Sequence, residues 1–309
     1  MSSKKNRYSR FDRIIYTVGA IYSLFLKLLP LRVSLFIGRC LGLIFYIIDF
    51  HHRKIGLTNL RFAFGSEKDE KEIRSIARKH FQHLGMTAHE WLCLKSLGEE
   101  DLKKICDKIY VEGKEHLISA KKKSQVVIIL SAHFGNWEYS HLCYSSRINR
   151  LNFIVRKLDN SFLERERIEY NQKFNVNILY KENGLRKAIR NLRNGEDLVI
   201  FSDRKANLRE GIPSQFFGKK TSTIPLASAL SGKYKIPIVP MFIVRCKDKV
   251  HHKIIFQPMF NVGDLDGERA IQKGTQIQND NIEKAIRRYP DQWLWVHRKW
   301  KCYHASIYK

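Results

Sequence analysis

Residues 126–138 read VVIILSAHFGNWE, and this stretch decides how the chain folds. Its first five residues are apolar and mostly β-branched, a pattern typical of a short strand that is buried on both faces. Gly135 and Asn136 follow as turn or capping residues, and a helix is expected to open at Trp137. The stretch therefore predicts strand, turn and helix, with His133 at the end of the strand and Glu138 in the first helical turn.

The alternation of strand and helix continues downstream. Apolar runs predict strands at 152–155, 197–201 and 236–244, and helical segments separate them at 162–174, 184–194 and 224–232. Such alternation indicates an α/β core whose central sheet is largely parallel and flanked by helices. The active site of such a sheet usually lies beyond the carboxyl ends of its strands, which is where His133 is expected.

The chain divides into three parts. Residues 1–60 are basic and apolar, residues 61–125 are largely charged and helix-forming, and residues 126–309 hold the α/β core. Apolar residues at helical spacing in 66–108 predict an amphipathic helical region. We expect residues 61–309 to form one folded domain and residues 1–60 to form a helical membrane anchor.

The anchor contains two apolar stretches, 14–29 and 33–48, which Lys27 and Arg39 interrupt. A spanning helix needs about 20 apolar residues, and Arg39 makes the second stretch the poorer candidate. One short span or two interfacial helices would satisfy this pattern, and a buried helical hairpin is the alternative in a soluble protein. The flanking bases would keep the N-terminus on the cytoplasmic side and attract anionic lipid.

The charge balance favours anionic partners. The chain has 309 residues, with 56 Lys and Arg against 30 Asp and Glu, a net charge of +26. Nucleic acid, an acidic membrane, an acidic protein or a phosphorylated substrate would all suit this charge. Nucleic acid is the weaker alternative, because the bases are spread along the chain without a zinc finger, an RNP-like run or a basic recognition helix.

Cysteine, histidine and tryptophan usage adds three expectations. The six cysteines form no CxxC pair, which predicts unpaired structural thiols in a reduced compartment. We interpret His251 and His252 as solvated loop or edge-strand residues, not as metal ligands. The tryptophans of 293–300 suit either an interfacial belt or the core, and we expect at least two of them in the core.

His133 and Glu138 form a candidate catalytic pair. A hydroxyl that attacks a thioester or ester carbonyl needs a base to take its proton, and an imidazole suits this role near neutral pH. A carboxylate on the other ring nitrogen would fix the tautomer and stabilise the imidazolium. The spacing alone fits a strand-end histidine and a helix-capping glutamate equally well, so the rest of the chain must decide.

The setting His-Phe-Gly-Asn-Trp-Glu at 133–138 resembles the lipid A biosynthesis acyltransferase family, which comprises late lauroyl and myristoyl transferases. This family belongs to the glycerolipid acyltransferase superfamily with its His-x4-Asp/Glu motif. Segments that resemble further family motifs follow in the expected order at 57–64, 155–160, 194–203, 216–229, 238–240 and 292–301. The resemblance therefore covers almost the whole chain, and Trp137 with a glutamate at 138 favours the lipid A branch.

The resemblance implies transfer of a fatty acyl chain from acyl-acyl carrier protein to a hydroxyl of a lipid A precursor. His133 would be the general base, oriented by Glu138, with no metal or organic cofactor. Arg156 would grip a phosphate or the oxyanion, with a surface ion pair as the alternative. Asn160 would hold the loop of Arg156 or contact substrate, or cap a turn. Asp203 would orient Arg156 or another cation, or end a strand.

Partners and place follow from the same resemblance. The expected partners are acyl carrier protein, the lipid A precursor and the anionic membrane, with no nucleic acid. The expected location is the inner membrane of a Gram-negative bacterium, with the active site on the cytoplasmic side. Another glycolipid or phospholipid acceptor, such as glycerol phosphate, is the alternative. Residues 203–207 (DRKAN) and 224–225 depart from the family pattern and leave the acceptor and the chain length open.

Overall fold

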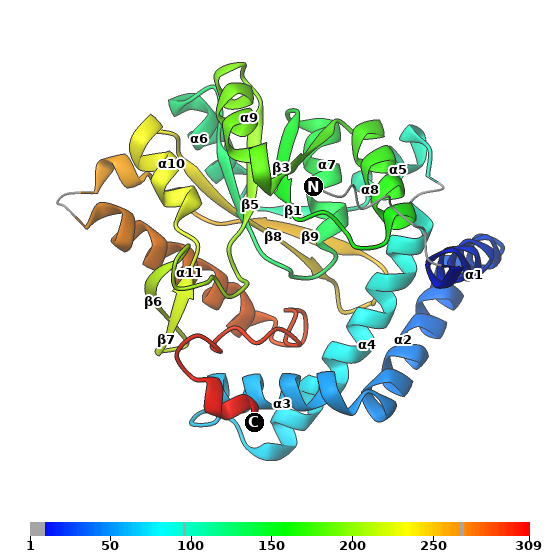
Figure 1. Cartoon of the computed structure of the whole chain (residues 1–309). Coiled ribbons are helices and arrows are strands. Elements are labelled where there is room, and N and C mark those ends of the chain that lie inside the picture. Colours follow the sequence, from blue (N-terminus) through cyan, green and yellow to red (C-terminus); the bar gives the residue numbers. More distant parts are fainter. Residues whose placement is uncertain (1–9, 95–96, 266–268) are drawn as a thin grey trace, which may run out of the picture.

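The computed structural model describes residues 10–94, 97–265 and 269–309 (Figure 1). In chain order the helices are α1 (Arg10–Lys27), α2 (Leu31–Ile48), α3 (Phe50–Phe64), α4 (Glu70–Leu94), α5 (Glu99–Asp107), α6 (Lys114–Lys123), α7 (Trp137–Arg147), α8 (Ser161–Lys173), α9 (Lys181–Arg193), α10 (Leu226–Tyr234) and α11 (Ala270–Arg288), with 3-10 turns at Val262–Asp264 and Ala305–Tyr308. The strands are β1 (Tyr110–Glu112), β2 (Ile128–Ser131), β3 (Leu151–Val155), β4 (Val176–Tyr180), β5 (Asp197–Phe201), β6 (Ile212–Phe216), β7 (Lys219–Thr223), β8 (Ile238–Arg245) and β9 (His252–Phe256).

Seven strands form one sheet in the order β1-β9-β8-β2-β5-β3-β4, and β6 and β7 form a separate antiparallel hairpin. The five strands from β8 to β4 run parallel to one another. At the other edge, β9 is antiparallel to β8 and β1 is parallel to β9. The predicted largely parallel α/β sheet flanked by helices is confirmed, and β2 lies at its centre.

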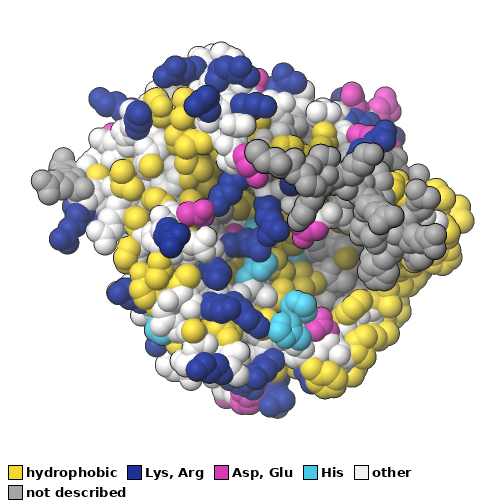
Figure 2. All heavy atoms as spheres, in the orientation of Figure 1, with side chains coloured by type: hydrophobic (Ala, Val, Ile, Leu, Met, Phe, Trp, Pro, Cys, Tyr) yellow, Lys and Arg dark blue, Asp and Glu magenta, His cyan; other side chains and the backbone are white. Residues whose placement is uncertain are grey.

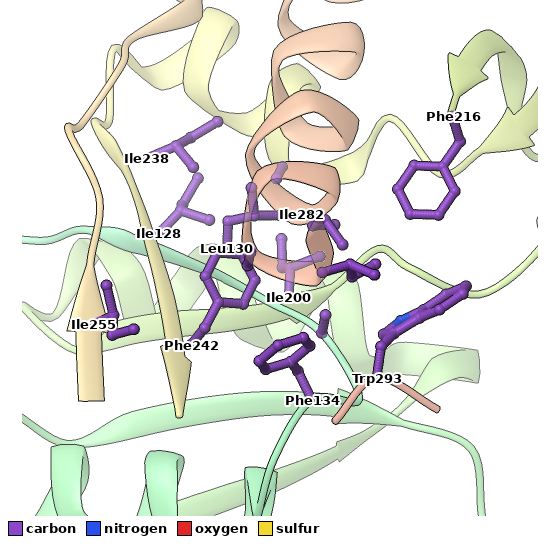
Figure 3. Close-up of a cluster of buried hydrophobic side chains, with 14 of the residues drawn as sticks. Ile128, Leu130, Phe134, Ile200, Phe216, Ile238, Phe242, Ile255, Ile282 and Trp293 are labelled. Carbon is purple, nitrogen blue, oxygen red and sulfur yellow. The ribbon is translucent and has the colours of Figure 1, made fainter. Parts of the chain in front are cut away.

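The sheet is buried on both faces because β2 sends alternate side chains to two separate clusters. Ile128 and Leu130 pack with residues of α10 and α11, and Figure 3 shows this cluster. Val127 and Ile129 pack on the opposite face with residues of α5, α6 and α7. Continuous apolar runs mark strands with this environment, and the predicted strands at 152–155, 197–201 and 236–244 are confirmed as β3, β5 and β8.

The C-terminal segment belongs to the core. Trp293, Trp295 and Trp300 are fully buried, which confirms the core interpretation for all three. The amide of Asn59 in α3 donates to the main-chain oxygens of Trp295 and His297, at 2.5 and 2.6 Å. This contact fixes the C-terminal segment against α3.

The same contact corrects the limits of the expected anchor. Helix α3 lies mostly within residues 1–60, yet Leu57, Leu60 and Phe64 are buried in the core cluster of the α/β sheet. Among the residues that the structure describes, the exposed large apolar side chains gather on α1 and α2. Their exposed large apolar residues are Val18, Ile21, Leu24, Phe25, Leu31, Val33, Phe36, Ile44, Phe45, Ile47 and Ile48. This exposure contradicts the buried-hairpin alternative.

Helix α2 corresponds to the second apolar stretch, which the sequence indicates as the poorer candidate for a spanning helix. Within the described ranges, it alone is long and apolar enough to cross a membrane. By length and composition the second stretch is thus the better spanning candidate, because α2 begins at Leu31 and contains a single charged residue after its first turn, Arg39. One face of α2 packs along α4, where Gly38 and Gly42 meet Gly85 with their backbones in close contact.

Two cysteines are joined. Cys106 in α5 and Cys143 in α7 form a disulfide, so the prediction of six unpaired thiols is wrong for this pair. They are 37 residues apart in sequence, but the packing of α5 on α7 brings their Cα atoms to 5.5 Å. The spacing of the cysteines in the sequence does not predict this disulfide.

His252 also differs from the sequence interpretation. It is buried in β9, with its Nε2 atom 3.6 Å from a carboxylate oxygen of Glu90, whereas His251 is partly exposed in the preceding turn. The interpretation as a solvated residue is wrong for His252, because β9 pairs with β8 and is covered by helices of the core.

The contact between α2 and α4 gives a stability prediction. A methyl group at Gly85 would clash with the carbonyl oxygen of Gly38, so Gly85→Ala should lower the free energy of unfolding by about 1–3 kcal/mol. Gly19→Ala in α1 is the matched control, because its added carbon meets no atom within 4 Å. Thermal unfolding of the three proteins in the same lipid nanodiscs checks this. Equal losses for both variants would contradict the close contact.

Lys299 gives a second prediction. It is fully buried, and burial lowers its pKa from 10.5 to about 8, although Asp203 and Cys302 oppose the shift. The unfolded chain keeps this proton up to a higher pH than the folded chain does. Below pH 8 the amine is charged in both states, and burying that charge lowers the free energy of unfolding by its full amount. This loss becomes smaller as the pH rises from 8 toward 10.5. Lys299→Met should raise the free energy of unfolding by on the order of 3 kcal/mol at pH 7.

The gain should shrink to about 1 kcal/mol at pH 9.5. Denaturant unfolding of both proteins at the two pH values measures it. A gain that does not change with pH, or a loss at pH 7, would show that the buried charge is not the cause.

Candidate active site

His133 and Asp203 meet at the carboxyl edge of the central sheet. The register of the parallel strands β2 and β5 places Ser131 beside Phe201, and each of the two site residues follows its strand by two positions. The Nδ1 atom of His133 lies 3.0 Å from Oδ1 of Asp203, and the main-chain N–H of His133 donates to Oδ2 at 3.0 Å. The sheet topology therefore creates the pair, not a local sequence motif.

Asp203 is an ionised, buried carboxylate. Its side chain has no exposed surface, and the indole N–H of Trp293 donates to its Oδ2 atom at 2.9 Å. Burial alone would raise its pKa, but the charge and hydrogen bonds of His133, together with Trp293, hold the pKa of Asp203 well below its usual range. Because this carboxylate only accepts hydrogen bonds, we assign the proton of a neutral His133 to Nδ1, which leaves Nε2 as the basic nitrogen.

This geometry corrects the predicted role of Glu138. The sequence predicts that Glu138 orients His133, but Asp203 occupies the ring nitrogen that this role requires. Glu138 instead accepts hydrogen bonds from the hydroxyl of Tyr170 at 2.7 Å and from the indole of Trp137 at 3.1 Å. Glu138 does not bind His133 because α7 begins at Trp137 and directs the Glu138 side chain toward Tyr170 of α8.

His133 and Glu138 nevertheless line the same cleft. This cleft has a volume of about 510 Å³, and its wall includes Trp137, Phe153 and Phe201. Four bases and two histidines besides His133 line the cleft or stand directly beside it: Arg156, Lys157, Arg167, Arg204, His141 and His297. Figure 2 shows Lys and Arg side chains gathered near histidines at the centre of this face. The cleft is suited to an anionic substrate that reaches an apolar wall.

Of the two residues predicted to bind substrate, Arg156 lies at the cleft and Asn160 caps a helix. Arg156 lies at the cleft, and its largely exposed guanidinium pairs with Asp159 at 3.4 Å. The surface ion pair considered as an alternative is therefore present, and the group remains open to solvent. The side-chain oxygen of Asn160 accepts from the N–H groups of Phe162 and Leu163, at 3.0 and 3.1 Å, so Asn160 caps α8.

His297 is a site residue that the sequence did not single out. Its ring centre lies 5.6 Å from that of His133. Burial, with smaller contributions from Arg204 and His133, lowers the pKa of His297 to about 4. It is therefore neutral at physiological pH and adds no positive charge beside the basic nitrogen of His133.

The loop of His133 is held from behind by a C-terminal segment. The main-chain oxygen of His133 accepts from the N–H of Leu294 at 3.0 Å, and the N–H of Gly135 donates to the oxygen of Gln292 at 2.9 Å. Gly135 has a φ of +59°, and a side chain there would clash with the carbonyl of Ile243. Only glycine fits this turn, which keeps the loop pressed against β8.

A buried ion pair supports the other end of the loop. Asn136 caps α7 and donates through its amide to Glu90 at 2.8 Å. Glu90 also accepts two hydrogen bonds from the guanidinium of Arg245, one of them at 2.7 Å. Although burial opposes it, the charges of Arg245 and His252 lower the pKa of Glu90. The N–H of Tyr139 donates to the side-chain oxygen of Asn136, which confirms Asn136 as a cap. No sequence pattern links Asn136, Glu90 and Arg245.

No metal centre is evident in the described ranges, where no group of three or more His, Cys, Asp or Glu side chains is placed to hold an ion. The residues at the cleft are those of acid–base chemistry. A basic imidazole nitrogen next to a basic-lined cleft can remove a proton from a hydroxyl and can return it to a leaving group.

The chain resembles known acyltransferases over most of its length. The family model described as bacterial lipid A biosynthesis acyltransferase matches residues 1–302. The chain is 24% identical over 281 residues to the lipid A biosynthesis palmitoleoyltransferase of Escherichia coli K12, covering 88% of this chain and 86% of that protein. It is 23% identical to the lipid A biosynthesis lauroyltransferase of the same organism, covering 88% of this chain and 87% of that protein.

Two further similarities are weaker. The lipid A biosynthesis acyltransferase of Haemophilus influenzae is 19% identical over 279 residues, covering 90% of this chain and 85% of that protein. Among solved structures, the 1-acyl-sn-glycerophosphate acyltransferase PlsC of Thermotoga maritima aligns with a TM-score of 0.39 and 13% identity, covering 87% of this chain and 97% of that one.

The buried pair behind the loop gives a prediction. Removing either partner leaves an uncompensated charge in the interior, so Glu90→Gln and Arg245→Met should each lower the free energy of unfolding by about 3–5 kcal/mol. The double variant should lose clearly less than the sum of the two. Glu169→Gln, which breaks the exposed pair with Arg165, is the control and should change stability by less than about 1 kcal/mol.

Denaturant unfolding of the four variants and the parent tests this coupling. Strict additivity of the two single losses would mean that Glu90 and Arg245 do not interact as the geometry indicates.

Proposed function

The chain belongs to the bacterial lipid A biosynthesis acyltransferase family, and on that basis we propose that it moves a fatty acyl chain from acyl-acyl carrier protein to a hydroxyl of a lipid A precursor. Acyl transfer to a lipid A precursor is the activity of the family. The donor, the catalytic residues and the place in the cell are our proposals. The observation that carries the mechanism is the contact between His133 and Asp203 beside a basic cleft.

In the proposed reaction, His133 acts as general base through Nε2. The acceptor oxygen attacks the thioester carbonyl, while its proton passes to Nε2 and the carbonyl electrons move to oxygen. When the tetrahedral intermediate collapses, the carbon–sulfur bond breaks, the ester forms, and the imidazolium returns the proton to the departing thiolate. Asp203 holds Nδ1 throughout and stabilises the imidazolium. This route needs no covalent acyl-enzyme, metal or organic cofactor.

Glu138 keeps a place in the proposed site with a changed role. It lines the cleft, and its carboxylate is fixed by Tyr170 and Trp137, with His141 3.6 Å away. A fixed negative charge in the same cleft favours the imidazolium that forms on His133 during the transfer. We propose that Glu138 stabilises that charge through space, while Asp203 orients the ring.

The basic residues at the cleft are proposed to bind the anionic parts of the substrates. Arg156 has its guanidinium exposed, and Lys157 and Arg204 line the same wall. A guanidinium fork binds phosphate oxygens in pairs, so Arg156 suits a phosphate of the acceptor or of the donor's pantetheine arm. The proposed contribution of Asn160 is indirect, since it caps α8 directly after the loop that holds Arg156.

We also propose that α1 and α2 hold the protein on the inner membrane of a Gram-negative bacterium, with the cleft facing the cytoplasm. Both helices expose apolar residues, and Figure 2 shows hydrophobic side chains along the side where Figure 1 places them. Because one face of α2 packs on α4, the pair suits burial in one leaflet better than a free span. The net charge of +26 suits an anionic lipid surface and an acidic carrier protein.

Asp203→Asn tests the mechanism. An asparagine of the same size cannot hold the imidazolium in the same way, so kcat should fall by about 10³-fold or more. Asp159→Asn is the matched control, because Asp159 lines the same cleft but is exposed and pairs with Arg156 instead of His133, and it should keep most of the activity. Turnover is measured by mass spectrometry with acyl-acyl carrier protein and a lipid A precursor.

Circular dichroism of both variants shows whether they are folded. A folded Asp203→Asn variant with near-normal kcat would exclude Asp203 as the orienting residue. Glycerol phosphate acceptors are assayed in parallel, and preferential acylation of these would favour the alternative acceptor.

A further inference from the structure

A second cavity, of about 580 Å³, lies away from the catalytic cleft. It is bounded by α5, α6 and α7 over the strands β8 and β9, and its lining shares no residue with that of the cleft. Helix α7 separates them along its length: Trp137 and Glu138 contact the cleft, whereas Tyr144 and Arg147 contact the cavity. A volume in the range of about 300–1,000 Å³ is typical of sites for small molecules.

The interior of this cavity is apolar. Its wall consists of Leu117, Met241, Ile254 and Phe256, together with the disulfide between Cys106 and Cys143. Val111, Ile118 and Ile148 stand at its edge with 45% of their surface exposed. Single exposed apolar side chains are common on protein surfaces, but several grouped around one cavity are typical of a ligand site. This grouping therefore indicates a surface that a ligand covers.

The charged residues that line the cavity are all cations. They are Lys114, Lys121, Lys122 and Arg147, and no acidic side chain belongs to the lining. Lys121 is neutralised by Asp197 and Arg147 by Asp107. The side-chain amines of Lys114 and Lys122 have no ion pair or hydrogen bond to any of the described residues. The cavity therefore combines an apolar interior with two uncompensated positive charges at its rim.

We propose that this cavity binds a long-chain fatty carboxylate, with the hydrocarbon chain inside and the carboxylate at Lys114 and Lys122. The apolar wall removes the chain from water, and the two amines supply the charge that a carboxylate requires. A neutral chain would leave the lysines unused, and a folded partner protein would cover the rim without filling the interior. This site is additional to the catalytic cleft and does not depend on the proposed acyl transfer.

Photo-crosslinking of the full chain in nanodiscs of zwitterionic lipid tests the proposal. The probe is a palmitate with a diazirine near its methyl end, and the labelled peptides are identified by mass spectrometry. We expect labelling of α6, α7 and β9 residues of the cavity, competition by excess palmitate, and at least tenfold weaker competition by hexadecanol. Labelling confined to α1, α2 or the catalytic cleft would overturn the proposal.

Charge reversal supplies the matched comparison. Lys114→Glu with Lys122→Glu should reduce labelling of the cavity at least tenfold, because both residues are exposed rim cations. Arg186→Glu with Lys187→Glu makes the same charge change on exposed positions of α9 and should leave labelling unchanged. Ile118→Trp, which narrows the mouth, should also reduce it. Equal labelling of the two charge-reversed proteins, or competition by hexadecanol as strong as by palmitate, would refute a carboxylate site.

Discussion

The buried carboxylate of Asp203 is the group on which the arrangement of the site depends. It accepts hydrogen bonds from the imidazole and the backbone of His133 and from the indole of Trp293. These contacts join the ends of β2 and β5 to the C-terminal segment. Removing such a charge from water is costly. The three hydrogen bonds compensate for this cost, and so does the positive charge that His133 carries when it is protonated. The same contacts set the tautomer of His133 and leave its second nitrogen available for a proton.

The remainder of the structure keeps this pair in place. Gln292 and Leu294 hold the loop through its backbone, and Asn136 connects the start of α7 to the buried pair of Glu90 and Arg245. Glu90 lies on α4, the helix against which α2 packs with its apolar outer face exposed. The proposed membrane contact and the catalytic loop are thus both attached to α4.

Much of the fold can be predicted from the sequence, and less of the site. Strands such as β2, β5 and β8 are buried on both faces, so their continuous apolar runs identify them. The edge strand β4 interrupts its apolar run with Asn177, and the β6–β7 hairpin is largely polar, so neither was predicted. The pairing of β2 with β5 is a property of strand order, which periodicity does not encode. For this reason the sequence predicts Asp203 as a site residue but not as the partner of His133, and it assigns that place to Glu138. The disulfide depends on how α5 packs on α7, and the Glu90–Arg245 pair on how α4 packs on β8, so periodicity does not predict them either.

The central claim is that His133 is the base for acyl transfer to lipid A. Mass spectrometry of lipid A from cells that lack this protein, and then regain either the wild-type chain or His133→Ala, tests it most directly. The wild-type chain should restore a mass increase equal to one acyl chain, and fragmentation should place that chain on a hydroxyl of the precursor. His133→Ala, present in the membrane at the same level, should restore none. Full restoration by the variant, or no change in lipid A with the wild-type chain, would contradict this account.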